Sequence, residues 1–151
     1  MRLDILSMKF TGVTSDMRYC TRENIHVDRN ASAWLIKRYL DPEAEFVFVA
    51  GETPLPNTIP FDMYGVEWGH HGDRCTFETI IALHGLMDPI LQQIAHIVHG
   101  ADITADADET LESPGIDLLF RGLRMISESD AQALERGYMV MEALYTGLKN
   151  Q

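Results

Sequence analysis

Apolar and polar positions in the first half of the chain predict a small sheet with one early helix. Residues 20–29 fit a strand or extended segment that ends at His26-Val27-Asp28. From Asn30 onward, apolar side chains recur every three or four positions, which is typical of an amphipathic helix. The continuous apolar run at residues 46–50 predicts a strand buried on both faces. Two short extended pieces, residues 59–63 and 64–68, are expected after a proline-containing loop.

The second half of the chain has helical periodicity. Proline at a first helical position, a polar N-cap and glycine past the end mark the limits of each helix. The predicted helices are residues 76–86 ending at Gly85, residues 89–101 starting at Asp88-Pro89, one starting at Pro114, and a last one capped by Ser129 or Asp130 and running to Leu148. Residues 102–113 are expected to form an exposed loop or a disordered segment. We therefore predict an α/β fold in which a small sheet in the N-terminal half packs against a mainly helical C-terminal half.

The chain of 151 residues suits one domain and is long enough to bury a sizeable core. Residues 1–18 alternate only weakly, which predicts a leader or an edge strand, and residues 19–151 are expected to form the single domain. Apolar runs fall short of the roughly 20 residues of a membrane span. The N-terminus also lacks the long apolar core of a secretory signal. We therefore expect a cytoplasmic protein without a membrane partner.

The formal net charge of −11 narrows the classes of partner. A surface this acidic repels phosphate backbones, so direct nucleic-acid binding by this chain alone is not expected. Cations or a basic partner fit better, and an oligomer is left open. The two cysteines, Cys20 and Cys75, are too few for a disulfide framework. Each is either a small buried apolar residue or a metal-binding or reactive thiol.

The densest group of chemically active side chains is the run His70-His71-Gly72-Asp73-Arg74-Cys75. It lies on an expected strand-to-helix turn, where functional groups are often held. Imidazole, carboxylate and thiolate are the side chains that bind transition metals. We predict a site for a divalent metal ion (Zn, Fe or Mn). Its candidate ligands are His26, Asp28, His70, His71, His99 and Asp102, and the candidate groups that would hold and orient those ligands are Asp62, Asp73, Cys75 and Glu78.

Local geometry leaves alternatives open for these residues. Two positions apart on an extended segment, His26 and Asp28 would point to the same side, unless Asp28 is only a helix cap. Adjacent strand residues face opposite ways, so at most one of His70 and His71 faces a given ion unless the chain bends there. The other histidines fit a core position at His84 and a solvated polar face at His96.

Three arginines lie beside these clusters in an otherwise acidic protein: Arg22, Arg29 and Arg74. A guanidinium group binds oxyanions well, and Arg29 precedes a helix N-terminus, where backbone N–H groups also favour anions. A small oxyanion is therefore a candidate ligand. The alternative is that these arginines pair with Asp28 and Asp73.

Several long runs resemble the C-terminal domain of the ChrB-type chromate-resistance proteins. They include Tyr19-Cys20-Thr21-Arg22, His26-Val27-Asp28-Arg29-Asn30-Ala31-Ser32-Ala33-Trp34, Phe61-Asp62-Met63, His70-His71-Gly72-Asp73-Arg74-Cys75-Thr76-Phe77-Glu78 and Ile97-Val98-His99-Gly100-Ala101-Asp102. The resemblance covers about residues 19–148. It implies a role in chromate resistance, as a chromate-sensitive regulator or an accessory protein, with chromate as the oxyanion.

The order of the candidate residues is also similar to that of DHH-type metal phosphoesterases. Their pattern has an HxD near a strand end, a lone Asp, a His-His pair and a late Asp, here matched by Asp62 and Asp102 among others. This similarity implies Mn²⁺ or Mg²⁺ and a metal-bound water that attacks a phosphate ester. The chain departs from the pattern at Gly69, where an Asp is expected. Whether the protein is a metal- and oxyanion-binding protein, a hydrolase or a structural partner module stays open.

Overall fold

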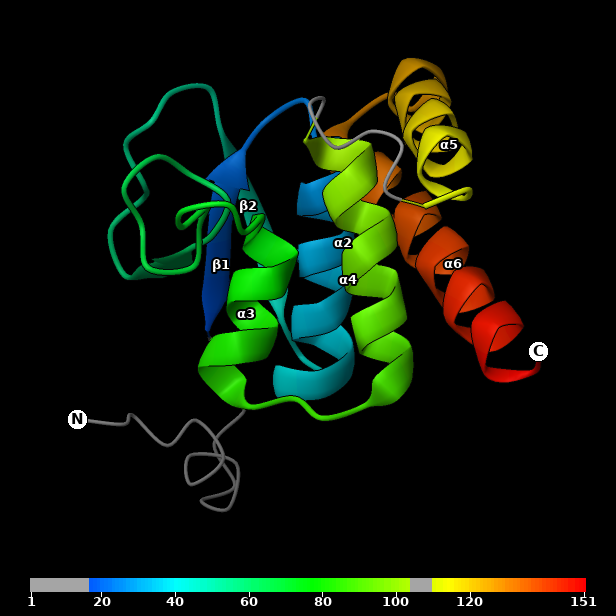
Figure 1. Ribbon diagram of the computed structural model, residues 1–151. Helices are drawn as coiled ribbons and strands as arrows, with labels where there is room; N and C mark the ends of the chain where they lie inside the picture. The colour runs from blue at the N-terminus through cyan, green and yellow to red at the C-terminus, as the bar shows by residue number, and fades with distance from the viewer. Residues whose placement is uncertain (1–16, 104–109) are drawn as a thin grey trace.

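A three-stranded parallel sheet and a set of helices packed beside it make up the protein (Figure 1). The computed structural model describes residues 17–103 and 110–151. The elements in chain order are β1 (Arg18–Arg22), α2 (Val27–Leu35), the π-helical turn η2 (Ile36–Leu40), β2 (Glu45–Val49), β3 (Thr58–Pro60), α3 (Thr76–His84), α4 (Pro89–Asp102), α5 (Ser113–Ile126) and α6 (Asp130–Lys149). The predicted α/β fold, with the sheet in the N-terminal half and a mainly helical C-terminal half, is confirmed.

The central strand of the sheet is β1. It pairs in parallel with β2 on one side and with β3 on the other, so the order is β2-β1-β3. Cys20 at its middle lies opposite Val47 of β2 and Pro60 of β3. Because all three strands run the same way, the segments that follow β1 and β3 start at one edge of the sheet.

Helix α2 occupies the centre of the helical layer, and the other helices pack around it (Figure 1). Nearly all of its residues are buried, including Trp34 with 1 % of its surface exposed. The Trp34 ring stacks on Phe77 of α3 at 6.4 Å between centroids and also contacts Tyr145 of α6. An aromatic side chain of this size buries about 150–250 Å². Trp34 therefore joins α2, α3 and α6 in one core.

Polar contacts also hold α6 to the rest of the domain. Glu142 accepts hydrogen bonds from Trp34 Nε1 and from Arg38, both at 2.8 Å. The Arg38 guanidinium lies 4.0 Å from the centre of the Tyr145 ring, a favourable cation–π distance. The Tyr145 hydroxyl in turn donates to Asp88, the N-cap of α4, at 2.6 Å. These contacts connect the last helix to both α2 and α4.

The helix-end signals of the sequence are confirmed at several places. Asp88 caps α4 by accepting from the Ile90 N–H, and Ser129 caps α6 by accepting from the Gln132 N–H. Gly85 ends α3 with a left-handed φ of +59°. These signals involve neighbours along the chain, so they are readable without tertiary information.

Two strand predictions are wrong in part. The apolar run around Phe46 forms β2 at an edge of the sheet, and its side chains stay partly exposed instead of being buried on both faces. An edge strand has a neighbouring strand on one flank, so apolar composition alone does not place it in the interior. The predicted extended piece at residues 64–68 is a loop with one bridge between Phe61 and Trp68.

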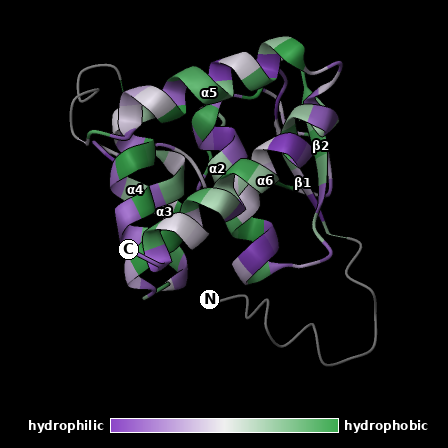
Figure 2. Cartoon of the chain, turned by 90° about the vertical axis from the view of Figure 1, so that its right-hand side faces the viewer, coloured by the Kyte–Doolittle hydropathy of each residue, from purple (hydrophilic) through white to green (hydrophobic). Residues whose placement is uncertain are grey.

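Helix α5 carries exposed apolar side chains, and Figure 2 shows hydrophobic colouring along it. Leu118 is 65 % exposed and Met125 78 % exposed. Within the described residues, every helix is too short or too polar to cross a lipid bilayer. The predicted leader at residues 1–18 lies mostly outside the described residues, as does half of the predicted acidic loop at residues 102–113. At the two ends of that range, Asp102 belongs to α4 and Ser113 to α5 instead.

Candidate metal centre

The chemically active side chains gather at the edge of the sheet where the parallel strands end. Asp28 lies in the first turn of α2, shortly after β1, and Asp62 follows β3 by two residues. The chain leaves β1 toward β2 on one side, and β3 lies on the other side, so the direction of the connections reverses between β1 and β3. Open parallel sheets bind ligands at this kind of switch point, beyond the carboxyl ends of the strands.

Asp28 is a buried carboxylate held by the N-terminus of α3. Its Oδ2 accepts the Thr76 N–H at 2.9 Å, and its Oδ1 accepts the Phe77 N–H at 3.0 Å. The Ser32 hydroxyl donates to Oδ1 at 3.3 Å from one turn further along α2. Only 1 % of the Asp28 side-chain surface is exposed. A buried carboxylate needs such donors, and they fix its position in the site.

Asp62 adopts a backbone conformation that non-glycine residues rarely take. Its φ is +49°, in the left-handed region, where Asp and Asn are the better-tolerated side chains. The Thr76 hydroxyl donates to Oδ1 at 2.7 Å, and Arg29 Nε lies 3.1 Å from Oδ2. An Arg29 amino group also donates to the Asp62 carbonyl at 3.3 Å. Backbone strain of this kind is found mainly at functional sites, where surrounding contacts maintain it.

His70 is the point at which carboxylates from separate parts of the chain meet. Its Nε2 lies 3.1 Å from Asp28 Oδ2, 3.4 Å from Asp62 Oδ1 and 3.2 Å from Asp102 Oδ2. Asp102 is the last residue of α4, so α2, the segment after β3 and the end of α4 each supply one carboxylate. Donor atoms of Asp28, Asp62 and His70 all lie within 4.8 Å of one another, which is close enough to share one ion. The His70 side chain is 48 % exposed, so the cluster is open to solvent.

Charge couples the protonation states of these groups. Hydrogen bonds to Asp102, Asp28 and Asp62 raise the pKa of His70 to about 12. Burial raises the pKa of Asp28, and the negative charges of Asp62 and Asp102 act in the same direction. Burial also opposes ionisation of Asp62, but the bond from His70 and the charge of Arg29 outweigh it and hold its pKa below the usual value. The three carboxylates therefore favour the protonated, positively charged form of His70.

A second group of candidate ligands adjoins the first. Cys75, Glu78 and His99 offer donor atoms that lie within 4.8 Å of one another. His99 Nδ1 lies 2.7 Å from Glu78 Oε1, and the Cys75 N–H donates to Glu78 Oε2 at 3.3 Å. Burial raises the pKa of the Cys75 thiol, and the negative charges of Asp28 and Glu78 add to the effect.

Two predicted ligands, His26 and His71, lie away from both groups. Helix α2 begins at Val27, so His26 is its N-cap and the predicted extended segment carrying His26 and Asp28 is wrong. The His26 Nε2 instead contacts Asp117 of α5 at 2.6 Å. The ring of His71 bonds to the Glu67 carbonyl at 2.8 Å and is exposed. Only His70 of these two adjacent histidines contacts the carboxylate cluster, in keeping with the expectation that at most one of them faces a given ion.

The three candidate oxyanion-binding arginines do not form one patch. Arg22 pairs with Glu52 at 2.5 Å, and Arg74 is exposed in the turn that also contains His71 and Asp73. Arg29 pairs with Asp62 and not with Asp28 or Asp73, the partners that the alternative predicted. Arg29 is therefore the one of these three guanidinium groups that borders the carboxylate cluster.

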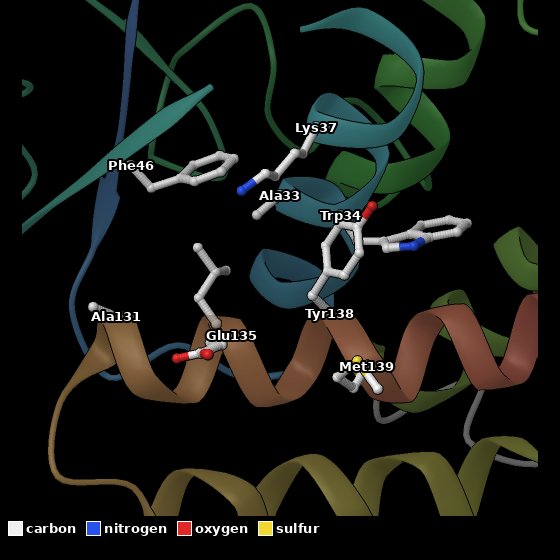
Figure 3. A pocket seen from close by; sticks show the side chains of 9 residues that line it. Ala33, Trp34, Lys37, Phe46, Ala131, Glu135, Tyr138 and Met139 are labelled. Carbon is white, nitrogen blue, oxygen red and sulfur yellow. The ribbon is translucent and has the colours of Figure 1, made fainter. Parts of the chain in front are cut away.

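A separate cavity lies between the edge strand β2 and helices α2 and α6. Its volume is about 330 Å³, and Figure 3 shows Phe46, Trp34, Tyr138 and Met139 around it. The candidate metal ligands are not among its lining residues. The candidate metal ligands and this cavity therefore lie in different parts of the molecule.

The sequence predicted Asp62 as a group that holds the metal ligands in place, whereas in the structure it contacts His70 directly. Its position just past a short strand was the available signal, because side chains at the carboxyl ends of neighbouring parallel strands meet. His96 is exposed, as predicted. The core position predicted for His84 is confirmed only in part: His84 is half-buried against the Trp68 ring at 4.9 Å, and its Nε2 has no hydrogen-bond partner among the described residues.

Comparison with known proteins identifies the family of the chain. The family described as "ChrB, C-terminal domain" matches residues 19–148. The chain is also 34 % identical over 132 residues to Protein ChrB of Cupriavidus metallidurans. That match covers 85 % of this chain and 40 % of the relative, so the chain spans less than half of the relative's length. No solved structure matches the chain. The chain therefore belongs to the ChrB C-terminal domain family, which confirms the resemblance seen in its sequence motifs.

Proposed function

We propose that this domain binds a divalent metal ion through Asp28, Asp62 and His70, with Asp102 as a further donor. The observation that carries the proposal is the contact of one imidazole nitrogen with three carboxylates at 3.1–3.4 Å. A ring nitrogen has at most one hydrogen to donate, so three carboxylates exceed what it can satisfy. A metal ion accepts several ligands at once and would satisfy all of them.

The spacing of the donor atoms suits such an ion. With metal–ligand distances of about 2.1 Å, neighbouring ligands stand about 3.0 Å apart in an octahedron and about 3.4 Å apart in a tetrahedron. The separations of 3.1, 3.2 and 3.4 Å from His70 Nε2 fall at these values. Small side-chain shifts are therefore enough to seat an ion. A donor set dominated by carboxylates favours Mn²⁺ or Fe²⁺ over Zn²⁺.

We further propose that the metal centre serves chromate resistance, as a sensor or an accessory protein. Family membership supports this role, since the sequence motifs are those of ChrB-type chromate-resistance proteins. The exposure of His70 leaves room for a small ligand on the solvent side. Chromate oxygens are hard donors that suit a hard ion, and Arg29 lies beside Asp62 with a guanidinium group suited to oxyanions.

A second function has its own support in the site. Asp28, Asp62, His70 and Asp102 meet in the chain order of the DHH-type phosphoesterases, and they do so at the carboxyl edge of a parallel sheet. A metal-bound water at this position would attack a phosphate ester. Hydrolysis of bis(p-nitrophenyl) phosphate with Mn²⁺ tests this alternative, and activity that depends on His70 would favour the enzyme.

Metal content of the purified chain tests the main proposal. Elemental analysis and calorimetric titration with Mn²⁺, Fe²⁺ and Zn²⁺ should show binding by the wild-type protein. Asp62→Asn keeps the side-chain shape, and Asn tolerates the positive φ, so this variant removes charge with little change of backbone. We expect its affinity to fall at least tenfold. The control is Asp73→Asn, which removes an exposed carboxylate from the same loop and should bind normally.

Two results would contradict the proposal: a wild-type protein that binds no metal, or an Asp62→Asn variant that binds as well as Asp73→Asn. The oxyanion part has a separate test. Titration of the metal-loaded protein with chromate should give saturable binding, while sulfate, with the same charge and shape, measures the nonspecific contribution. Equal binding of both anions would contradict selectivity for chromate, but it would not contradict the proposed metal site.

A further inference from the structure

We infer that Cys75, Glu78 and His99 form a second metal position, distinct from the carboxylate cluster and suited to a softer ion such as Zn²⁺. Their donor atoms lie within 4.8 Å of one another, and none of the three belongs to the set Asp28, Asp62 and His70. Thiolate, imidazole and carboxylate are the three protein ligands that zinc takes. The inference has its own ligands and does not rest on the proposed function.

Two helix ends bring these side chains together. Cys75 is the N-cap of α3, and Glu78 is three residues later, on the same side of the first turn. Glu78 accepts the Cys75 N–H with Oε2, which leaves Oε1 directed at His99 Nδ1, 2.7 Å away. His99 lies in the last turn of α4 with 9 % of its surface exposed. The position is therefore set by the packing of α3 against α4.

The surroundings favour a cation at this place. Cys75 is fully buried, and the negative charges of Asp28, Glu78 and Asp102 all act on it. The three carboxylates beside this buried, neutral thiol favour a positive charge that would compensate them. A zinc ion compensates that charge and binds the sulfur directly. A purely apolar role for Cys75 explains its burial but not its three charged neighbours.

The second position adjoins the first. Asp102 follows His99 by three residues in α4, which corresponds to about 4.5 Å along the helix axis and to the same side of the helix. Asp28 in turn accepts the N–H groups of Thr76 and Phe77, the two residues after Cys75. Three protein ligands leave a fourth coordination position open at a zinc ion. The structure thus supports a pair of unlike ions, a hard one near His70 and a soft one near Cys75.

Cobalt replaces zinc as a coloured probe to test the second position. When the full chain, reduced and free of metal, is titrated with Co²⁺, a strong sulfur-to-cobalt charge-transfer absorption should develop in the near ultraviolet. Cys75→Ser should abolish this absorption. The matched control is Cys20→Ser, which changes the other buried cysteine, in β1, and should retain it.

His70→Ala separates this inference from the proposed function. This variant should lose the ion at the carboxylate cluster and still give the sulfur-to-cobalt absorption. The inference is overturned by a wild-type protein without the absorption, by a Cys75→Ser variant that keeps it, or by its loss in His70→Ala. Loss of the ion at the carboxylate cluster alone would contradict only the proposed function.

A second measurement covers the case in which Cys75→Ser does not fold. In Cys20→Ser the thiol of Cys75 is the single cysteine in the sequence. Zn²⁺ should slow its alkylation by iodoacetamide at least tenfold, because a metal-bound thiolate is shielded. Glu78→Gln should weaken this protection. An alkylation rate that Zn²⁺ does not change would overturn the inference.

Discussion

Replacing His70 with alanine removes the side chain whose Nε2 contacts the carboxylates of Asp28, Asp62 and Asp102. His71→Ala is a matched control, because it deletes an adjacent imidazole that bonds instead to the Glu67 carbonyl. Both rings are exposed, so neither substitution opens a cavity in the core. The difference between the two variants therefore isolates the contribution of the ring that faces the cluster.

The expected magnitude follows from linkage. Metal at 100 times its Kd stabilises the folded state by about 2.7 kcal/mol. About 1 kcal/mol corresponds to roughly 2–4 °C in Tm for a domain of this size, so wild type and His71→Ala should each gain about 5–11 °C. If loss of a ligand weakens affinity by about a hundredfold, the same metal concentration equals the Kd. The gain in His70→Ala then falls to about 0.4 kcal/mol, or roughly 1–2 °C.

The assay is thermal unfolding by far-ultraviolet circular dichroism, once with EDTA and once with Mn²⁺, Fe²⁺ or Zn²⁺. The increment produced by metal is the readout, because His70→Ala also removes a positive charge from beside three carboxylates and so lowers Tm without metal. Equal increments in the two variants would refute the assignment of His70. A larger loss in His71→Ala would place the ion on the other side of the loop.

The remaining predictions concern stability. Gly137→Ala in α6 places a Cβ 2.8 Å from Asn30 Cγ, so overpacking should destabilise the protein by about 1–3 kcal/mol in urea unfolding. Gly147→Ala in the same helix meets nothing within 4 Å and should be neutral or stabilising; similar losses in both would contradict the packing argument. The hydrogen bond from Tyr145 holds the pKa of Asp88 below its usual value. The stability that ionised Asp88 contributes is therefore present above its pKa in the unfolded chain, and it is lost as the pH falls through its pKa in the folded protein. Asp88→Asn should therefore be less stable than wild type at pH 7 and approach it in acid; a constant difference across pH would contradict this.

The amino-acid sequence by itself determined the local features of this protein. The caps at Asp88 and Ser129 and the end of α3 at Gly85 depend on neighbours along the chain, so they could be recognised from residue types. The same holds for the richness of His70–Cys75 in candidate ligands and for family membership, since both are properties of the residues in order.

The tertiary structure decided which of those candidates meet. His70 was separated from His71 by the path of the loop over the sheet edge, and Asp62 joined the cluster because β3 ends beside β1. His26 was directed to α5 because α2 begins one residue after it. Each outcome depends on contacts between segments tens of residues apart. A side-chain pattern along one segment does not contain the register of such contacts, so only the packed chain specifies the site.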